Sequence, residues 1–184
     1  MALRKASAYS HRYARPYTRH SKKKGKNYIK AVPASKVVKM DMGDIKGFNE
    51  GKYSVIFRLV TTENVQIRDN ALEAARQFIH KQLESNLVGQ YCLMLKLHPH
   101  HVLRENKMLT GAGADRMSTG MSLSFGVTIG RAAMARAGQD IFVAAVNGDK
   151  GKKIARESFE KVRPKMPCAC RIVVEERKAG AAAA

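Results

Sequence analysis

The chain has 184 residues and a hydrophobic content of 45%, which is enough apolar material for one ordinary domain with a real core. Its 34 lysines and arginines against 15 acidic residues give a formal net charge of +19, a balance that favours a polyanionic partner such as nucleic acid. No apolar run approaches the roughly 18–20 residues of a membrane span, and the N-terminus lacks a secretory signal, so we expect a cytoplasmic protein without a membrane role.

Residues 1–40 form a strongly basic segment, with twelve lysines and arginines and no acid before Asp41. Four of the six tyrosines are interleaved with these cations. Arginine forks match phosphate geometry and tyrosine rings stack on unpaired bases, so the mixture favours folded RNA over the simpler alternative of a generic polyanion-binding tail. We therefore predict that residues 1–34 are an RNA-binding extension. The residues expected to contact RNA are Arg4, Lys5, Arg12, Arg15, Tyr17, Arg19, Lys22, Lys23, Lys24 and Lys26, together with Arg116, Arg131 and Arg136 of the folded domain.

Two strands and a long helix are expected next along the chain. Residues 36–42 and 53–61 are predicted to be strands, the second because it is rich in β-branched and aromatic side chains. Asp69 or Asn70 is positioned to cap a helix that ends near 86–89. Residues at helical spacing predict which side of this helix faces the core. The inward set is Leu72, Ala75, Ile79 and Leu83, and the outward set is Glu73, Gln77, Lys81 and Glu84.

The second half of the chain is expected to add more strands and one helix. The predicted elements are a buried strand at 91–97, strands at 127–135 and 140–146 joined by a turn, a helix at 150–163 and a strand at 168–176. Because strands follow one another rather than alternate with helices, we predict a two-layer α+β fold over residues 35–177, with a mostly antiparallel sheet and two helices. Residues 178–184 carry little information.

Residues 98–126 do not show a clean strand period, and they contain four glycines. Insertions this long inside a compact domain are usually functional or disordered. The segment has little net charge, while glycines at 111 and 113 would let its backbone come close to a partner. We therefore expect one long functional loop inside the single domain.

Other functions are weaker alternatives. Residues 111–114 resemble the start of a dinucleotide-binding fingerprint, but Arg116 stands where its third glycine belongs, so no cofactor is expected. The histidines at 98, 100 and 101 and the three cysteines lack the ligand-pair spacing of structural zinc, so no metal is expected either. An RNA-modifying or RNA-cleaving enzyme with a substrate-capturing basic arm stays open, as does a stand-alone binder of double-stranded RNA, although no catalytic residue stands out.

Three stretches of the chain resemble one protein family. They are LHPHHVLRENKMLTGAGADRMSTGM at 97–121, RPYTR at 15–19 and ALEAAR at 71–76, and the resemblance extends over nearly the whole chain. The family is the universal large-subunit ribosomal protein sixteen family, called ten-e in archaea and eukaryotes. The chain lacks a long C-terminal extension and has Thr110 and Gly111 where eukaryotic members tend to have Ser-Cys, so it is similar to the archaeal members.

The resemblance implies a hammerhead-like α+β fold that binds large-subunit ribosomal RNA below the central protuberance, near the 5S RNA. It implies that a loop at about 104–115 points toward the peptidyl transferase centre and the acceptor ends of transfer RNAs, while peptide transfer itself belongs to RNA. It also implies neighbouring ribosomal proteins as partners, late addition during subunit assembly and an archaeal counterpart of the eukaryotic export adaptor. The loop residues concerned are Arg104, Asn106, Lys107, Met108, Thr110, Gly111, Gly113 and Asp115.

Overall fold

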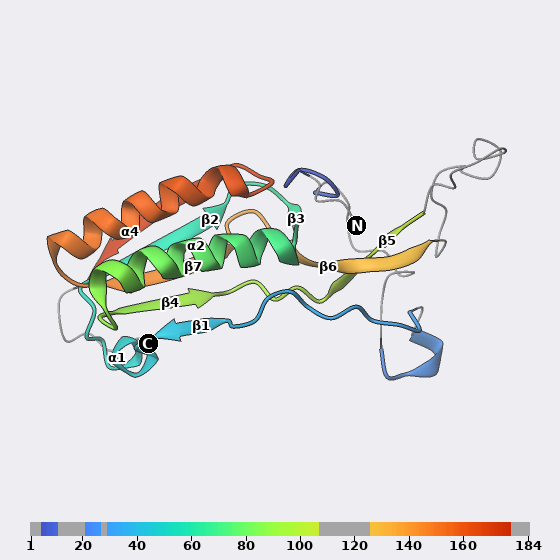
Figure 1. Cartoon of the computed structure of the whole chain (residues 1–184), viewed down its shortest axis with the longest axis horizontal. Coiled ribbons are helices and arrows are strands. Elements are labelled where there is room, and N and C mark those ends of the chain that lie inside the picture. Colours follow the sequence, from blue (N-terminus) through green and yellow to red (C-terminus); the bar gives the residue numbers. More distant parts are fainter. Residues whose placement is uncertain (1–4, 11–20, 27–28, 107–125, 178–184) are drawn as a thin grey trace.

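The computed structural model describes residues 5–10, 21–26, 29–106 and 126–177, and it contains two antiparallel sheets with helices against one of them (Figure 1). The five-stranded sheet has the order β1-β4-β7-β2-β8, and the three-stranded sheet has the order β3-β6-β5. Each pair of neighbouring strands in these sheets is antiparallel. The strands are β1 (Asp41–Gly43), β2 (Val55–Thr61), β3 (Val65–Arg68), β4 (Tyr91–Leu95), β5 (His101–Glu105), β6 (Val127–Ala135), β7 (Asp140–Val146) and β8 (Cys170–Glu176).

Two long helices, α2 (Asp69–Leu87) and α4 (Gly148–Val162), lie side by side over one face of the five-stranded sheet (Figure 1). Both bury an apolar stripe, which includes Leu72, Ile79 and Leu83 on α2 and Phe159 on α4. The ring of Phe159 packs against Phe57 of β2, with 6.2 Å between ring centroids. Each such side chain stabilises the fold by about 1.5–3 kcal/mol when fully buried. The five-stranded sheet, α2 and α4 therefore form the main core, called the body below.

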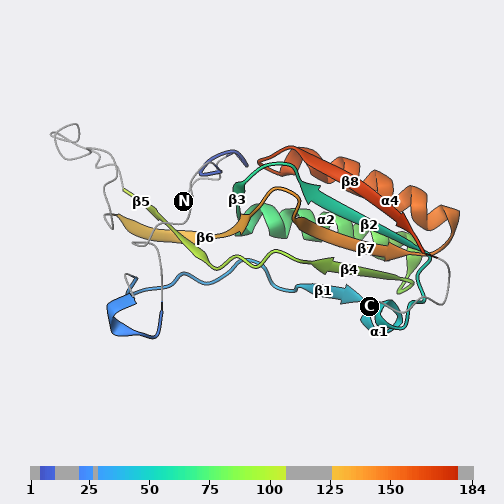
Figure 2. The ribbon, with the colours of Figure 1, turned by 180° about the vertical axis from the view of Figure 1, so that it is seen from behind.

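The β5–β6 hairpin projects from the body and builds most of the second sheet (Figure 2). Strand β6 is long enough to pair twice, with β3 through residues 132–135 and with β5 through residues 127–132. A short turn at 62–64 carries the chain from β2 in one sheet to β3 in the other. This second sheet is called the hairpin end below, together with residues 5–10 and 29–38, which contact it, and residues 21–26, which lie between these two segments in the chain.

The predicted α+β class is confirmed, and so are most of its elements. The strands expected at 53–61, 91–97, 127–135, 140–146 and 168–176 correspond to β2, β4, β6, β7 and β8. Both long helices begin and end within two residues of the expected positions. The strand expected at 36–42 is reduced to β1, because the backbone N–H groups of Lys36 and Val38 donate to side chains of α2 instead of pairing in a sheet.

Two strands and one α-helix were not expected, namely β3, β5 and the short helix α1 (Ile45–Asn49). Strand β5 corrects the expectation that 98–126 is loop throughout, because His101, Val102 and Leu103 are buried in a strand of that stretch. The sequence did not predict this strand, because the histidines and proline just before it interrupt the alternation of apolar and polar residues that indicates a strand. Strand β3 is four residues long and runs directly into α2, so no turn residue separates the two.

The outward set expected for α2 is wrong at Glu73, which is only 8% exposed. Its carboxylate accepts two hydrogen bonds from Arg76, at 2.8 Å from Nε and 2.5 Å from Nη2, and a third at 3.4 Å from the backbone N–H of Val38. The residue at the N-cap of α2 also differs from the expected Asp69 or Asn70. Arg68 occupies the N-cap position without a side-chain cap bond, and Asp69 instead accepts a hydrogen bond from the backbone of Lys36 at 3.1 Å.

Candidate RNA-binding surface

The N-terminal residues 5–10 lie against β3. The backbone N–H of Gln66 donates to the carbonyl of Ser10 at 3.0 Å, and the Gln66 amide donates to the carbonyl of Tyr9. Arg68 Nη2 donates to the carbonyl of Lys5 at 2.6 Å. Ser10 is 2% exposed, whereas Lys5 and Ser7 are exposed, so the segment is covered only at its end on β3. The first part of the basic segment is therefore attached to the hairpin end.

A second attachment is made by residues 29–38, called the strap below. Arg131 Nε of β6 donates to the carbonyl of Pro33 at 2.6 Å, and Thr128 Oγ1 donates to the carbonyl of Ala31 at 3.2 Å. Farther along, the strap donates its backbone N–H groups to Asp69 and Glu73 of α2. Arg76 holds the pKa of Glu73 below its usual range through hydrogen bonds and charge, so this carboxylate is ionised when it accepts from the strap.

Between these attachments the described residues 21–26 expose four lysines, Lys22, Lys23, Lys24 and Lys26. Figures 1 and 2 show this segment, with the short 3-10 helix η2 (Lys24–Lys26), on the side where the hairpin projects and away from α2 and α4. Positive charge is thus displayed beside the hairpin. The other expected residues lie outside the described ranges: Arg4, Arg12, Arg15, Tyr17, Arg19, Lys107, Met108, Thr110, Gly111, Gly113, Asp115 and Arg116.

Three of the arginines that were expected to contact RNA lie along the hairpin, and each lies at a different place in it. Arg131 holds the strap through Nε, so it has a structural contact as well as further donors for RNA. Arg104 Nη1 donates to the carbonyl of Gly126 at 3.1 Å, across the hairpin at the stem of the expected loop. Arg136 is exposed at the other end of β6, and Asn106 is partly exposed just after β5. The three arginines therefore do not form one cluster.

The histidine and cysteine side chains weighed in the sequence lie in separate places. His101 is buried, and this burial lowers its pKa, which favours the neutral ring. Cys168 and Cys170 lie 3.6 Å apart between sulfur atoms at the start of β8, while Cys92 is buried on β4. Among the described residues, no three His, Cys, Asp or Glu side chains are grouped to hold a metal ion. In the same residues, no helix has the length and apolar character that a membrane span requires.

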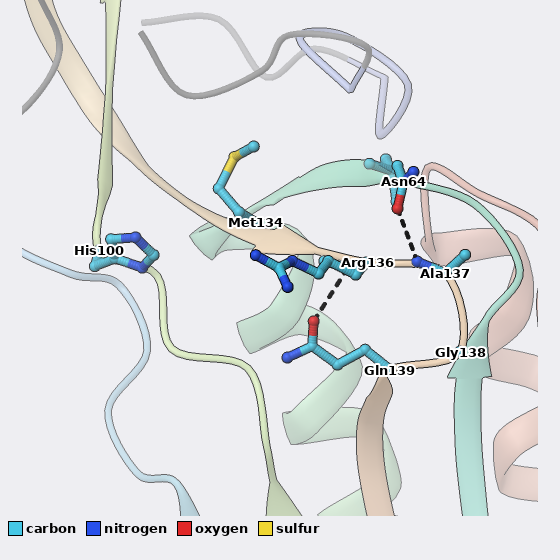
Figure 3. A pocket seen from close by; sticks show the side chains of 9 residues that line it. Asn64, His100, Met134, Arg136, Ala137, Gly138 and Gln139 are labelled. Atoms are coloured by element: carbon cyan, nitrogen blue, oxygen red, sulfur yellow. Dashed lines mark hydrogen bonds between the residues drawn. The ribbon is translucent and has the colours of Figure 1, made fainter. Parts of the chain in front are cut away.

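A pocket of about 870 Å³ opens where β6 ends and the chain turns into β7 (Figure 3). Its rim is fixed by two hydrogen bonds of 3.0 Å, from the backbone N–H of Ala137 to Asn64 Oδ1 and from that of Arg136 to Gln139 Oε1. The sequence had singled out Arg136 as an RNA contact and weighed His100 as a metal ligand, whereas Asn64 and Gln139 are ordinary turn residues until the fold brings them together. The lining residues are Asn64, Val65, His100, Met134, Ala135, Arg136, Ala137, Gly138 and Gln139.

These features define a class of protein: an α+β domain that displays its basic segment and a projecting hairpin at one end, an arrangement suited to a polyanion such as RNA. The particular family follows from comparison with known proteins. The model of the family "Ribosomal protein L16p/L10e" matches residues 14–173. The chain therefore belongs to the L16p/L10e family of ribosomal proteins, as its resemblance predicted.

Relatives from archaea are similar over nearly their whole length. The "Large ribosomal subunit protein uL16" of Thermofilum pendens is 41% identical over 178 residues, which cover 96% of this chain and 99% of the relative. The protein of the same name from a strain of Methanococcus maripaludis is 41% identical over 180 residues, or 97% of each chain. That of Pyrobaculum islandicum is 41% identical over 182 residues, or 98% of this chain and 96% of the relative. The expected archaeal type is confirmed.

Proposed function

We propose that this chain is a structural constituent of the large ribosomal subunit, in the cytoplasm, and binds ribosomal RNA through its basic segment and hairpin. The observation that carries the proposal is the attachment of the basic segment at both ends, by residues 5–10 on β3 and by the strap on β6. A segment held at two points loses less conformational freedom on binding than a free tail does. The names of the archaeal relatives support the same function.

The finer parts of this proposal concern location and partners. The RNA contacted lies near the 5S RNA and the central protuberance, and the loop at about 104–115 points toward the peptidyl transferase centre and transfer-RNA acceptor ends. The support is geometric as well as familial, because Arg104 ties the two strands together at the base of that loop. A rigid stem positions a loop more accurately than a flexible one. Neighbouring ribosomal proteins and a late assembly factor complete the set of partners.

One experiment tests the main proposal. A native lysate is separated on a sucrose gradient, and the chain is detected across the fractions. We expect it to sediment with large subunits and to stay with them in moderate salt, while the isolated protein neither cleaves nor modifies RNA. Turnover of RNA by the isolated protein, together with its absence from subunit fractions, would support the alternative of an RNA-processing enzyme.

A further inference from the structure

We infer that the pocket at the junction of the two sheets is a seat for one unpaired nucleotide of ribosomal RNA. The inference rests on the proposed ribosomal function and adds a binding site made of residues other than the lysines at 22–26 and the expected loop residues. The pocket has a volume of about 870 Å³. This lies within the roughly 300–1,000 Å³ of sites that hold small ligands, so a nucleotide fits while a duplex does not.

The polar side chains of the pocket select an acceptor-rich, anionic ligand. The carbonyl oxygens of the Asn64 and Gln139 amides already accept hydrogen bonds from the rim backbone. Each amide oxygen keeps one acceptor lone pair, but the N–H donors of the two amides and the guanidinium of Arg136, which is made only of donors, give the pocket an excess of donors. None of the 9 lining residues carries a carboxylate. A phosphate group has the charge and the oxygens that such a set of donors binds.

The rest of the pocket suits a base rather than a phosphate alone. Its inner wall is formed by Val65 and Ala135, which are 5% and 4% exposed. The polarisable thioether of Met134 and the ring of His100 also line it, and Figure 3 shows the Arg136 side chain extending toward the His100 side of the pocket. Flat bases pack on such groups when they are unstacked from their neighbours. One wall binds phosphate, and the others accommodate the base.

The pocket is also rigid before any ligand arrives. Its rim is joined to the body, because Thr61 Oγ1 donates to the carbonyl of Arg136 at 2.6 Å and the backbone N–H of Gly138 donates to the carbonyl of Thr61 at 2.8 Å. Thr61 itself is 1% exposed. Little ordering is then needed on binding, which is the condition under which a few contacts give useful affinity.

The test uses large subunits purified from cells in which each variant is the sole copy of the protein. The variants are Arg136→Ala, which removes the guanidinium, and Ala137→Phe, which fills the pocket without changing charge. Arg171→Ala is the matched control, since it removes an exposed arginine of β8 outside the pocket. Each preparation is probed with a reagent that acylates flexible ribose 2′-hydroxyl groups, and the amount of protein per subunit is measured in parallel.

We expect both pocket variants to increase the reactivity of the same one or two nucleotides by roughly tenfold, the effect of losing one base-stacking or comparable contact. The control should leave those nucleotides protected. If the pocket variants occupy subunits at the wild-type level and no nucleotide changes, the nucleotide seat is refuted while the ribosomal function stands. If Arg136→Ala exposes a nucleotide and Ala137→Phe does not, the guanidinium binds phosphate outside the pocket and the inference is equally wrong. Absence of the wild-type chain from large subunits would instead overturn the proposed function.

Discussion

The body and the hairpin end are held together by different interactions. In the body, apolar side chains of the five-stranded sheet pack against α2 and α4, and this core continues into the nearest part of the second sheet through Ile67 of β3 and Ala133 of β6. At the hairpin end, the N-terminal segments bury few side chains, chiefly Ile29 at 2% exposed, and are otherwise held by hydrogen bonds such as those that Arg68 and Arg131 donate to backbone oxygens. One such bond contributes about 0.5–1.5 kcal/mol, less than the burial of one large apolar side chain. Stability should therefore depend mainly on the body, whereas the N-terminal segments of the hairpin end can adjust when RNA binds.

Charge is distributed in the same unequal way. In the body, basic side chains pair with carboxylates, as Arg58 does with Glu175 at 2.9 Å and Lys152 with Glu176 at 2.9 Å. At the hairpin end, the lysines of residues 21–26 are exposed in a stretch of sequence that has no acid. The body neutralises its own charge, and the hairpin end presents charge to a partner.

The largest expected effect of a single substitution is in the core of the body. Phe159→Ala removes a fully buried ring that packs on Phe57, and we expect it to lower the free energy of unfolding by about 3–5 kcal/mol. Urea denaturation followed by circular dichroism measures the change. Val174→Ala, at a β8 position that is 43% exposed, is the control and should cost little. Equal losses from the two variants would contradict the assignment of stability to the body.

The second largest effect on stability is expected from breaking the buried ion pair between Glu73 and Arg76 on α2. Glu73→Gln leaves Arg76 without its charged partner and weakens the acceptor for the strap, so we expect a loss of about 3 kcal/mol in unfolding free energy. Because the pKa of Glu73 is lowered in the folded protein, its contribution is present above the unfolded-state pKa and disappears as pH falls through the folded-state pKa.

The difference between wild type and Glu73→Gln should therefore shrink on acidification through that range. Denaturation at a series of pH values measures it, with Glu157→Gln as the control because Glu157 is an exposed carboxylate on α4. A difference that stays constant from neutral to acidic pH would mean that the charge of Glu73 does not stabilise the fold.

The sequence predicted the body better than the hairpin end, for a physical reason. Elements such as α2 and β7 carry long apolar periods that any packed core requires, so their positions follow from local pattern. The errors at Glu73 and β5 have another origin. Glu73 is buried because Arg76 and the strap satisfy its carboxylate, and strand β5 exists because β6 pairs with it. Arg76 is a local partner three residues along the helix, but the contacts with the strap and with β6 cannot be read from the local sequence.

The candidate site was predicted unevenly for the same reason. Composition alone placed RNA contacts in the basic segment, and the exposed lysines at 22–26 agree with that interpretation without testing it. The pocket was not predicted, because Asn64, His100 and Gln139 are distant in sequence and meet only where the two sheets join. Anchors such as Tyr9 and Ser10 were missed as well, since they act through backbone carbonyls, which are the same in every residue.

A third prediction tests whether RNA affinity depends on the hairpin end. Replacing Lys22, Lys23, Lys24 and Lys26 together with alanine should weaken binding to large-subunit RNA by roughly a hundredfold and reduce the slope of log K against log salt by about 3–4. Filter binding at several salt concentrations measures both quantities. The control replaces four exposed lysines of the body, Lys81, Lys150, Lys153 and Lys161. If the control flattens the slope as much, RNA binds the body, and the contrast between the two regions is wrong.

The smallest expected effect separates the two regions most directly. Arg131→Lys removes the Nε–H that donates to the carbonyl of Pro33 while keeping the positive charge. Loss of one hydrogen bond worth about 1 kcal/mol should raise the equilibrium constant for local opening of the strap roughly fivefold. The free energy of global unfolding should stay nearly unchanged. Hydrogen exchange followed by mass spectrometry measures this, because strap amides that donate to Asp69 and Glu73 should exchange faster while those of α4 should not. Lys153→Arg, a charge-conserving change on exposed α4, is the matched control. Faster exchange in both the strap and α4 would show that the hairpin end and the body open together, because a strap that is coupled to the core cannot open without it.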